Sequence, residues 1–147
     1  MNGAEMHLLV NHISVFCLVF GAIALGVAMK RKSGDLRMFA SALFVIAGVA
    51  GWLTVESGES AETVVKALGG GTESFINEHA DAATWALRSG FLVAILALGM
   101  EWVVCKKPSW ARGLQWAVLI FAIHGSTVFI RTAFLGGLIR HTEIRDR

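Results

Sequence analysis

Apolar and polar positions divide the chain into four long apolar runs separated by polar segments. The runs cover about residues 8–29, 36–55, 82–104 and 114–139. A helix that crosses a bilayer needs about 20 mainly apolar residues, and each run is long enough. Because the first and third connections are short, consecutive helices are expected to pack antiparallel. The pattern therefore predicts an all-α, integral membrane four-helix up-and-down bundle, with residues 1–147 forming a single transmembrane domain.

Composition agrees with this class. The chain is 55% hydrophobic and 16% charged, whereas soluble proteins contain about 25% charged residues. A secretory signal carries its positive charges before its apolar core, but here no Lys or Arg precedes Lys30, so the first run is expected to remain as a span. The sequence offers no basic face for nucleic acid. We expect a multi-pass protein of the bacterial inner (cytoplasmic) membrane, in contact with the lipid bilayer.

Charge divides unevenly among the connections. The segment 56–81 contains a single basic residue, Lys66, among six acidic ones, whereas the first and third connections are basic. Lys and Arg are enriched in cytoplasmic loops, so the two basic connections are expected in the cytoplasm and segment 56–81 in the periplasm, with both chain ends outside (N-out/C-out). The basic residues are Lys30, Arg31, Lys32 and Arg37 in the first connection and Lys106, Lys107 and Arg112 in the third.

The acidic segment has a pattern of its own. Ser60 can cap a short amphipathic helix with Val64, Val65 and Leu68 on one edge, and the glycines at 69–71 end it. This predicts a short helical cap in the periplasmic 56–81 loop, over the outer end of the bundle.

The predicted topology brings several polar residues to that outer end. Charged residues inside spans are costly and usually face the interior, so Arg88 and Arg131, each about two turns inside its span, are candidates for binding an anion. His124 lies within about 20° of Arg131 around the same helix. The other candidates are His7 and His12 on the first run, Glu56, Glu59 and Glu62 after the second, and His79 before the third.

The two early histidines cannot both point to one site. His7 and His12 differ by about 140° around a regular helix. His12 lies deeper in the run, so we expect it to face inward and His7 to lie at the membrane interface.

These residue types suit a metal or haem. Neutral imidazole is the commonest metal ligand, and carboxylates add oxygen ligands, so a non-haem iron, copper or zinc ion is one prediction. Its ligands would be His12, His79 and Glu59, with His7, Glu56 and Glu62 as further candidates. The other prediction is haem b between His12 and His79, with Arg88 and Arg131 holding the propionates and His124 nearby. Hydrogen bonds and ion pairs between helices explain the same residues without a cofactor.

Three short motifs, "MHLLVNHIS", "ESGESAE" and "NEHADAA", resemble those of a group of small, uncharacterised bacterial four-helix membrane proteins. That group has an early His pair, a Gly-Glu-x-x-Glu-like element and a His-acidic element. The resemblance covers about the first 100 residues and implies the same fold and a metal or haem site. It departs at Ser60, where the group has proline. The layout also resembles four-helix membrane b-type cytochromes in architecture alone. The matching positions are His7, His12, Glu59, Glu62 and His79.

The leading hypothesis is a haem- or metal-binding protein in electron transfer. It would be a subunit or partner of a larger respiratory or photosynthetic complex, exchanging electrons with quinone or a periplasmic carrier. The alternative is a cofactor-free structural subunit whose small-residue helix faces pack on other membrane-protein subunits. A metalloenzyme is a third possibility, and the sequence leaves enzymatic activity open.

Overall fold

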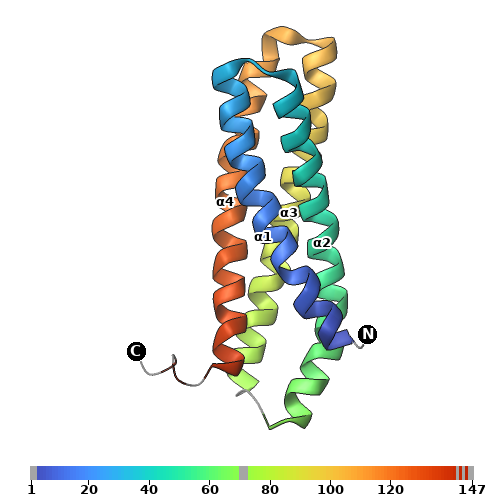
Figure 1. The fold of residues 1–147 in the computed structure, drawn as a ribbon, viewed down its shortest axis with the longest axis vertical. Coiled ribbons are helices and arrows are strands. Elements are labelled where there is room, and N and C mark those ends of the chain that lie inside the picture. Colours follow the sequence, from blue (N-terminus) through green and yellow to red (C-terminus); the bar gives the residue numbers. More distant parts are fainter. Residues whose placement is uncertain (1–2, 70–72, 142, 144, 146–147) are drawn as a thin grey trace.

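The computed structural model describes residues 3–69, 73–141, 143 and 145. These residues form four helices and no strand: α1 (Gly3–Arg31), α2 (Gly34–Ala67), α3 (Glu73–Lys106) and α4 (Pro108–Arg140). Consecutive helices run in opposite directions, so the chain goes up and down the bundle (Figure 1). The predicted all-α four-helix bundle is confirmed.

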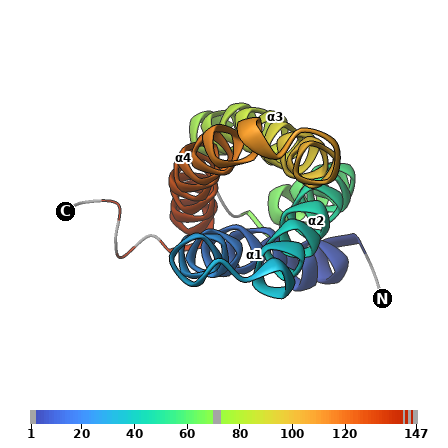
Figure 2. The same cartoon turned by 90° about the horizontal axis from the view of Figure 1, so that it is seen from above.

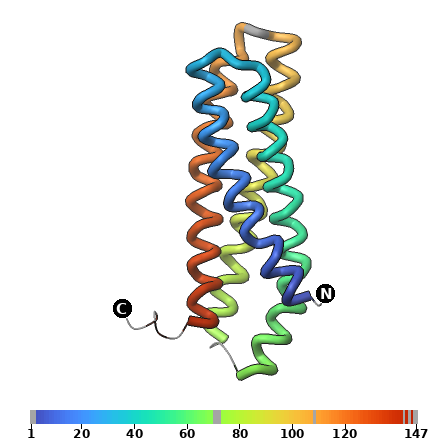
Figure 3. The backbone as a smooth tube through the Cα atoms, viewed as in Figure 1, coloured from blue at the N-terminus to red at the C-terminus, as the bar shows by residue number. Residues whose placement is uncertain are grey.

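The helices surround the bundle axis in chain order, each beside the next (Figure 2). α1 contacts α2 and α4, and α3 also contacts both of them. The turns from α1 to α2 and from α3 to α4 lie at one end (Figure 3), which we call the basic end after Lys30, Lys32 and Arg112. The start of α1 and the end of α4 lie at the opposite end, which we call the histidine end after His7 and His79.

All four helices are long and apolar enough to cross a membrane. Large apolar side chains cover their outer faces, and Phe20, Ile95 and Ile120 are 56%, 65% and 61% exposed. An extended apolar surface of this kind is rare on a soluble monomer and suits contact with lipid. The surface therefore indicates a multi-pass membrane protein.

The predicted helical cap in segment 56–81 is wrong. α2 continues without interruption to Ala67, and α3 begins at Glu73. Residues 56–67 contain no proline and one glycine, and Lys66 pairs with Glu62 one turn earlier at 2.7 Å, so the helix has no reason to end sooner. It ends at the predicted glycine run, where Gly69 has φ +65°.

Large apolar side chains fill the interior from the middle of the bundle to the basic end. Phe44 lies directly against Gly21, since a Cβ at residue 21 would stand 2.6 Å from the ring. Phe129 of α4 lies between Gly51 of α2 and Gly90 of α3, where an added Cβ would stand 3.2 Å from its ring in both cases. These glycines let the helix backbones approach the aromatic rings. The largest fully buried apolar side chains are Phe44, Leu18, Leu25, Met100, Val93 and Val118.

A partly buried ion pair joins α2 to α3 near the basic end. The Arg37 Nη2 atom lies 3.0 Å from Glu101 Oε2, and Arg37 Nε donates to both carboxylate oxygens at 3.1 Å. The Ser41 hydroxyl donates to Glu101 Oε1 at 2.8 Å. Because the carboxylate has several donors, the pair can lie in the bundle without an unpaired charge.

Candidate functional site

Two histidines from opposite helices of the bundle meet at the histidine end. The imidazoles of His7 on α1 and His79 on α3 have their centroids 6.4 Å apart and their planes at 75°. Both side chains are half-buried. Burial lowers the pKa of both imidazoles, and the neighbouring His7 ring lowers the pKa of His79 further, so the environment favours two neutral rings.

Each imidazole is held by a backbone carbonyl of the neighbouring helix. His7 Nδ1 lies 2.9 Å from the carbonyl oxygen of Thr54 on α2, and His79 Nδ1 lies 3.0 Å from that of Thr132 on α4. A carbonyl only accepts, so Nδ1 must carry the proton and donate it. In a neutral imidazole this leaves the Nε2 lone pair free. An Nδ1–H bonded to a backbone carbonyl is the usual second interaction of a histidine that binds metal through Nε2.

A glycine four residues after each threonine lies against the ring, and at Gly136 the absence of a side chain makes room for it. An added Cβ at Gly58 would stand 3.8 Å from the His7 ring, and one at Gly136 would stand 3.0 Å from the His79 ring. The pair of helices α1–α2 and the pair α3–α4 therefore contain the same unit of histidine, threonine carbonyl and glycine, which we call the histidine cradle.

Polar side chains continue along the inward face of α1 after His7. Asn11 and Ser14 follow at four and seven residues, a spacing that puts all three on one side of the helix. The Ser14 hydroxyl is fully buried and donates to the Ala47 carbonyl at 3.0 Å. The Asn11 Oδ1 atom is also buried, and it has no hydrogen-bond partner among the residues that the structure describes. A buried acceptor without a donor is unusual in a folded protein.

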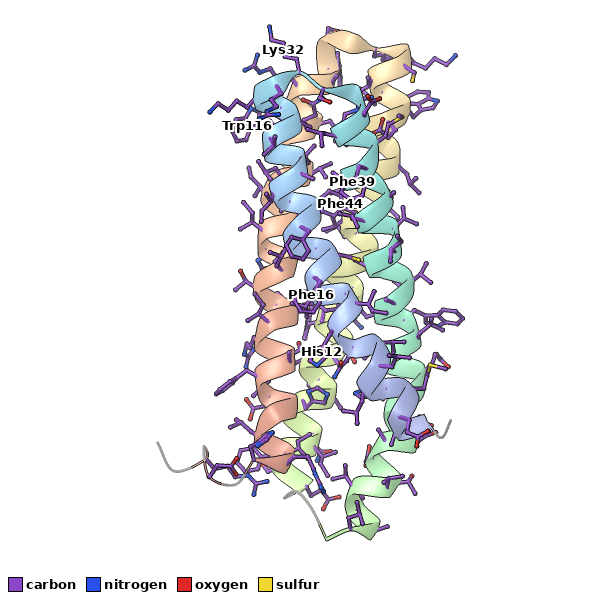
Figure 4. The ribbon with its side chains drawn as sticks, viewed as in Figure 1. His12, Phe16, Lys32, Phe39, Phe44 and Trp116 are labelled. Atoms are coloured by element: carbon purple, nitrogen blue, oxygen red, sulfur yellow. The ribbon has the colours of Figure 1, made fainter. Side chains whose placement is uncertain are left out.

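The structure reverses the expected placement of the two early histidines. His12 is exposed, with its ring 6.4 Å from that of Phe16 on the outer side of α1 (Figure 4). His7 is the inward residue because it shares a helix face with Ser14 and Leu18, which are both fully buried. His79, in contrast, is half-buried beside His7, and its predicted role as a metal ligand stays a prediction.

The predicted carboxylate ligands do not join the histidines. Glu56 and Glu59 are exposed on α2, and Glu62 pairs with Lys66. In the described part of the chain, no group of three or more His, Cys, Asp or Glu side chains lies close enough to hold a metal ion. The polar side chains nearby on α1 and α2 include Asn11, one turn after His7, and Ser57, whose hydroxyl oxygen lies 3.4 Å from His7 Nδ1.

No family model, curated protein or solved structure matches this chain. The resemblance to small bacterial four-helix proteins therefore stays a prediction.

The predicted anion-binding residues do come together, but outside the bundle. Arg88, His124 and Arg131 line an open groove of about 470 Å³ between α3 and α4. The Arg88 guanidinium lies 5.0 Å from the centroid of the Trp85 ring, and Arg131 Nη2 lies 3.7 Å from Glu78 Oε1. Both arginines are exposed. The groove that they line also includes Thr132, whose carbonyl accepts from His79, so their predicted role in holding propionates stays a prediction.

The spacing of the two rings suits a shared metal ion. Two metal–nitrogen bonds of about 2.0–2.1 Å hold imidazoles on opposite sides of one ion with centroids roughly 6 Å apart, whereas a tetrahedral angle would bring them to about 5 Å. The ring centroids of His7 and His79 are 6.4 Å apart.

Sequence reasoning identified His79 as a candidate, but it missed Asn11, Thr54 and Thr132. Their signal is the spacing Thr-x-x-x-Gly, which occurs at Thr54 and again at Thr132.

Proposed function

We propose that this chain is a metal-binding membrane protein that serves electron transfer, with the ion held between His7 and His79. The observation that carries the proposal is the paired histidine cradle, in which both Nδ1 atoms bond to carbonyls and both Nε2 atoms remain available. Metal sites of four-helix bundles are built in this way, from side chains of facing helices that project inward.

A bare transition-metal ion fits these residues better than a haem. Imidazole nitrogen suits copper, iron and zinc, and of these copper and iron can carry an electron. The buried Asn11 oxygen supplies a third donor one turn from His7. The arginines expected to bind propionates line the groove on the outer face instead.

In the cell, we propose a multi-pass location in the bacterial inner membrane. The basic end would face the cytoplasm by the positive-inside rule, and the histidine end would face the periplasm. A quinone or a periplasmic carrier would exchange electrons with the ion there, within a larger respiratory or photosynthetic complex.

Asparagine substitution tests the metal site directly. The amide nitrogen of asparagine can donate to the threonine carbonyl as histidine Nδ1 does, but asparagine has no atom in the position of histidine Nε2. We expect H7N and H79N to stay folded and to lose metal affinity by about 10–100-fold or more, since even the loss of a residue that supports a ligand has an effect of this size. The measurement is elemental analysis and metal titration of detergent-purified protein loaded with copper, iron or zinc.

The matched control is H12N, which changes an exposed histidine on the same helix. It should bind metal as the unchanged protein does. Equal metal retention in H7N, H79N and the unchanged protein would contradict the proposed site.

A second function is favoured by the same hydrogen bonds. Each histidine fastens one helix to its neighbour, as a cofactor-free structural subunit requires. Under this alternative the protein binds no metal, H7A and H79A lower its thermal stability, and the asparagine variants keep it. Retention of an ion that depends on both histidines would exclude this alternative.

A further inference from the structure

A second hollow lies at the basic end, far from the histidine pair. It has a volume of about 450 Å³ and is bounded by the end of α1, the start of α2 and the first turns of α4. Leu25, Ala28 and Met29 contribute apolar wall. The polar residues that line it are Lys30, Lys32, Ser33, Arg37, Arg112 and Gln115.

Positive charge in this hollow is largely uncompensated. Arg37 is neutralised by Glu101. The other three cations, Lys30, Lys32 and Arg112, form no ion pair with any residue in the described ranges. Three like charges around one hollow repel each other, and an anion with several oxygen atoms would relieve that repulsion.

The turn beside the hollow has a defined backbone. The Ser33 N–H donates to the Ala28 carbonyl at 3.0 Å, and the Ser33 hydroxyl accepts from the Leu36 N–H at 3.3 Å as the N-cap of α2. Lys32 therefore stands on a fixed turn between two long helices. These two hydrogen bonds fix the backbone on one side of the hollow.

Its surroundings match the headgroup level of a bilayer. Trp110 and Trp116 flank Arg112 on α4 and are 72% and 52% exposed. Tryptophan is enriched at the membrane–water interface. In Figure 4, Lys32 lies at the end of the bundle with Trp116 below it. A ligand in the hollow thus has cations beside it and an apolar surface next to it.

We propose that this hollow binds the headgroup of an anionic phospholipid. Basic pockets between transmembrane helices bind such headgroups. The guanidinium of Arg112 can donate two parallel hydrogen bonds to a phosphate, and the ammonium groups of Lys30 and Lys32 add point charges. The acyl chains run along the exposed apolar faces of the helices. The site does not depend on the proposed metal.

The test uses the full-length protein in mild detergent, titrated with phosphatidylglycerol, phosphatidylcholine or inorganic phosphate. Bound lipid is counted by native mass spectrometry. The hollow is altered in the triple variant K30Q/K32Q/R112Q. The matched control is R31Q/K106Q/K107Q, which removes the same charge from the same end without touching the lining. We expect the lining variant to lose at least about tenfold more phosphatidylglycerol affinity than the control, because both variants lose the same general attraction and only the lining variant loses direct contacts with the phosphate.

Several outcomes would overturn the lipid site. Equal losses in the two triple variants would mean diffuse attraction to a basic surface. If phosphatidylcholine bound as tightly as phosphatidylglycerol, the negative charge of the lipid would have no role in binding. Competition by millimolar inorganic phosphate would assign the hollow to a soluble anion instead. If the triple variant does not fold, the single variants R112Q and K107Q give the same comparison with smaller effects.

Discussion

The two helix pairs, α1–α2 and α3–α4, share the histidine cradle but differ in how closely they pack. α1 and α2 contact each other more extensively than α3 and α4 do. In the first pair, Ser14 bonds to the Ala47 carbonyl and Gly21 lies against the ring of Phe44. In the second pair, the position seven residues after the histidine is Ala86, which has no hydroxyl to donate.

The two pairs therefore differ in how closely their helices approach each other. In the first pair, Gly21 and Ser14 let α1 approach α2 at the Phe44 ring and at the Ala47 carbonyl. The second is open on its outer face, where Arg88, His124 and Arg131 line a groove of about 470 Å³. The same histidine cradle therefore occurs in a closely packed helix pair and in a more open one. Contacts outside the cradle account for the difference in packing between the two pairs.

The largest expected effect comes from removing the ring that closes the first pair. Phe44 is fully buried, so F44A should leave a cavity and lower the free energy of unfolding by about 3–5 kcal/mol. Thermal unfolding in detergent measures the loss. The control is F39A, at a position that is 56% exposed on the same helix, which should cost under about 1 kcal/mol. Equal losses would mean that Phe44 does not close the pair.

A stability effect of intermediate size should distinguish the two histidine cradles. In G136A the new Cβ would stand 3.0 Å from the His79 ring and displace it from Thr132, while in G58A it would stand 3.8 Å from the His7 ring in ordinary contact. Overpacking should cost G136A about 1–3 kcal/mol. G58A should be neutral or gain up to about 1 kcal/mol from the better helix propensity of alanine. Thermal unfolding compares them.

The control for G136A is G137A, since an added Cβ at that neighbouring position meets no atom within 4 Å. If G58A destabilises the protein as much as G136A, the two cradles are equally tight and the contrast between them fails.

The smallest expected effect is the loss of the Ser14 hydroxyl. S14A removes the hydrogen bond to the Ala47 carbonyl and should lower the free energy of unfolding by about 0.5–1.5 kcal/mol. S89A is the control, because the Ser89 hydroxyl bonds to the Ala86 carbonyl within its own helix. A stability change in S89A as large as that in S14A would show that the bond between helices adds nothing.

The sequence predicted the fold well because the apolar runs alone define four helices. It could not predict which histidine faces inward. α1 is apolar on nearly every side, so the usual contrast between an apolar and a polar face is missing. In such a helix the inward stripe is marked instead by polar and small residues at helical spacing, here His7, Asn11, Ser14 and Gly21. Depth along the helix, which favoured His12, says nothing about rotation around it.

The groups that hold the two histidines could not be predicted from the sequence either. Thr54 and Thr132 act through backbone carbonyls, which no side-chain motif reveals. The carboxylates after the second run looked like ligands because that segment was expected to fold back over the bundle. Once α2 continues straight, Glu59 lies on an exposed helix face instead.

The length of α2 bears on how a metal would reach the histidines. Its 34 residues rise about 1.5 Å each, for about 51 Å in all, whereas the hydrocarbon core of a bilayer is about 30 Å thick. Residues 56–67 lie beyond its apolar run, and α3 likewise begins nine residues before its own run at 82. In the membrane placement proposed above, this excess length would project into the aqueous phase at the histidine end. An ion bound there would then exchange with water rather than pass through lipid, and its occupancy would follow the free-metal concentration of one compartment alone.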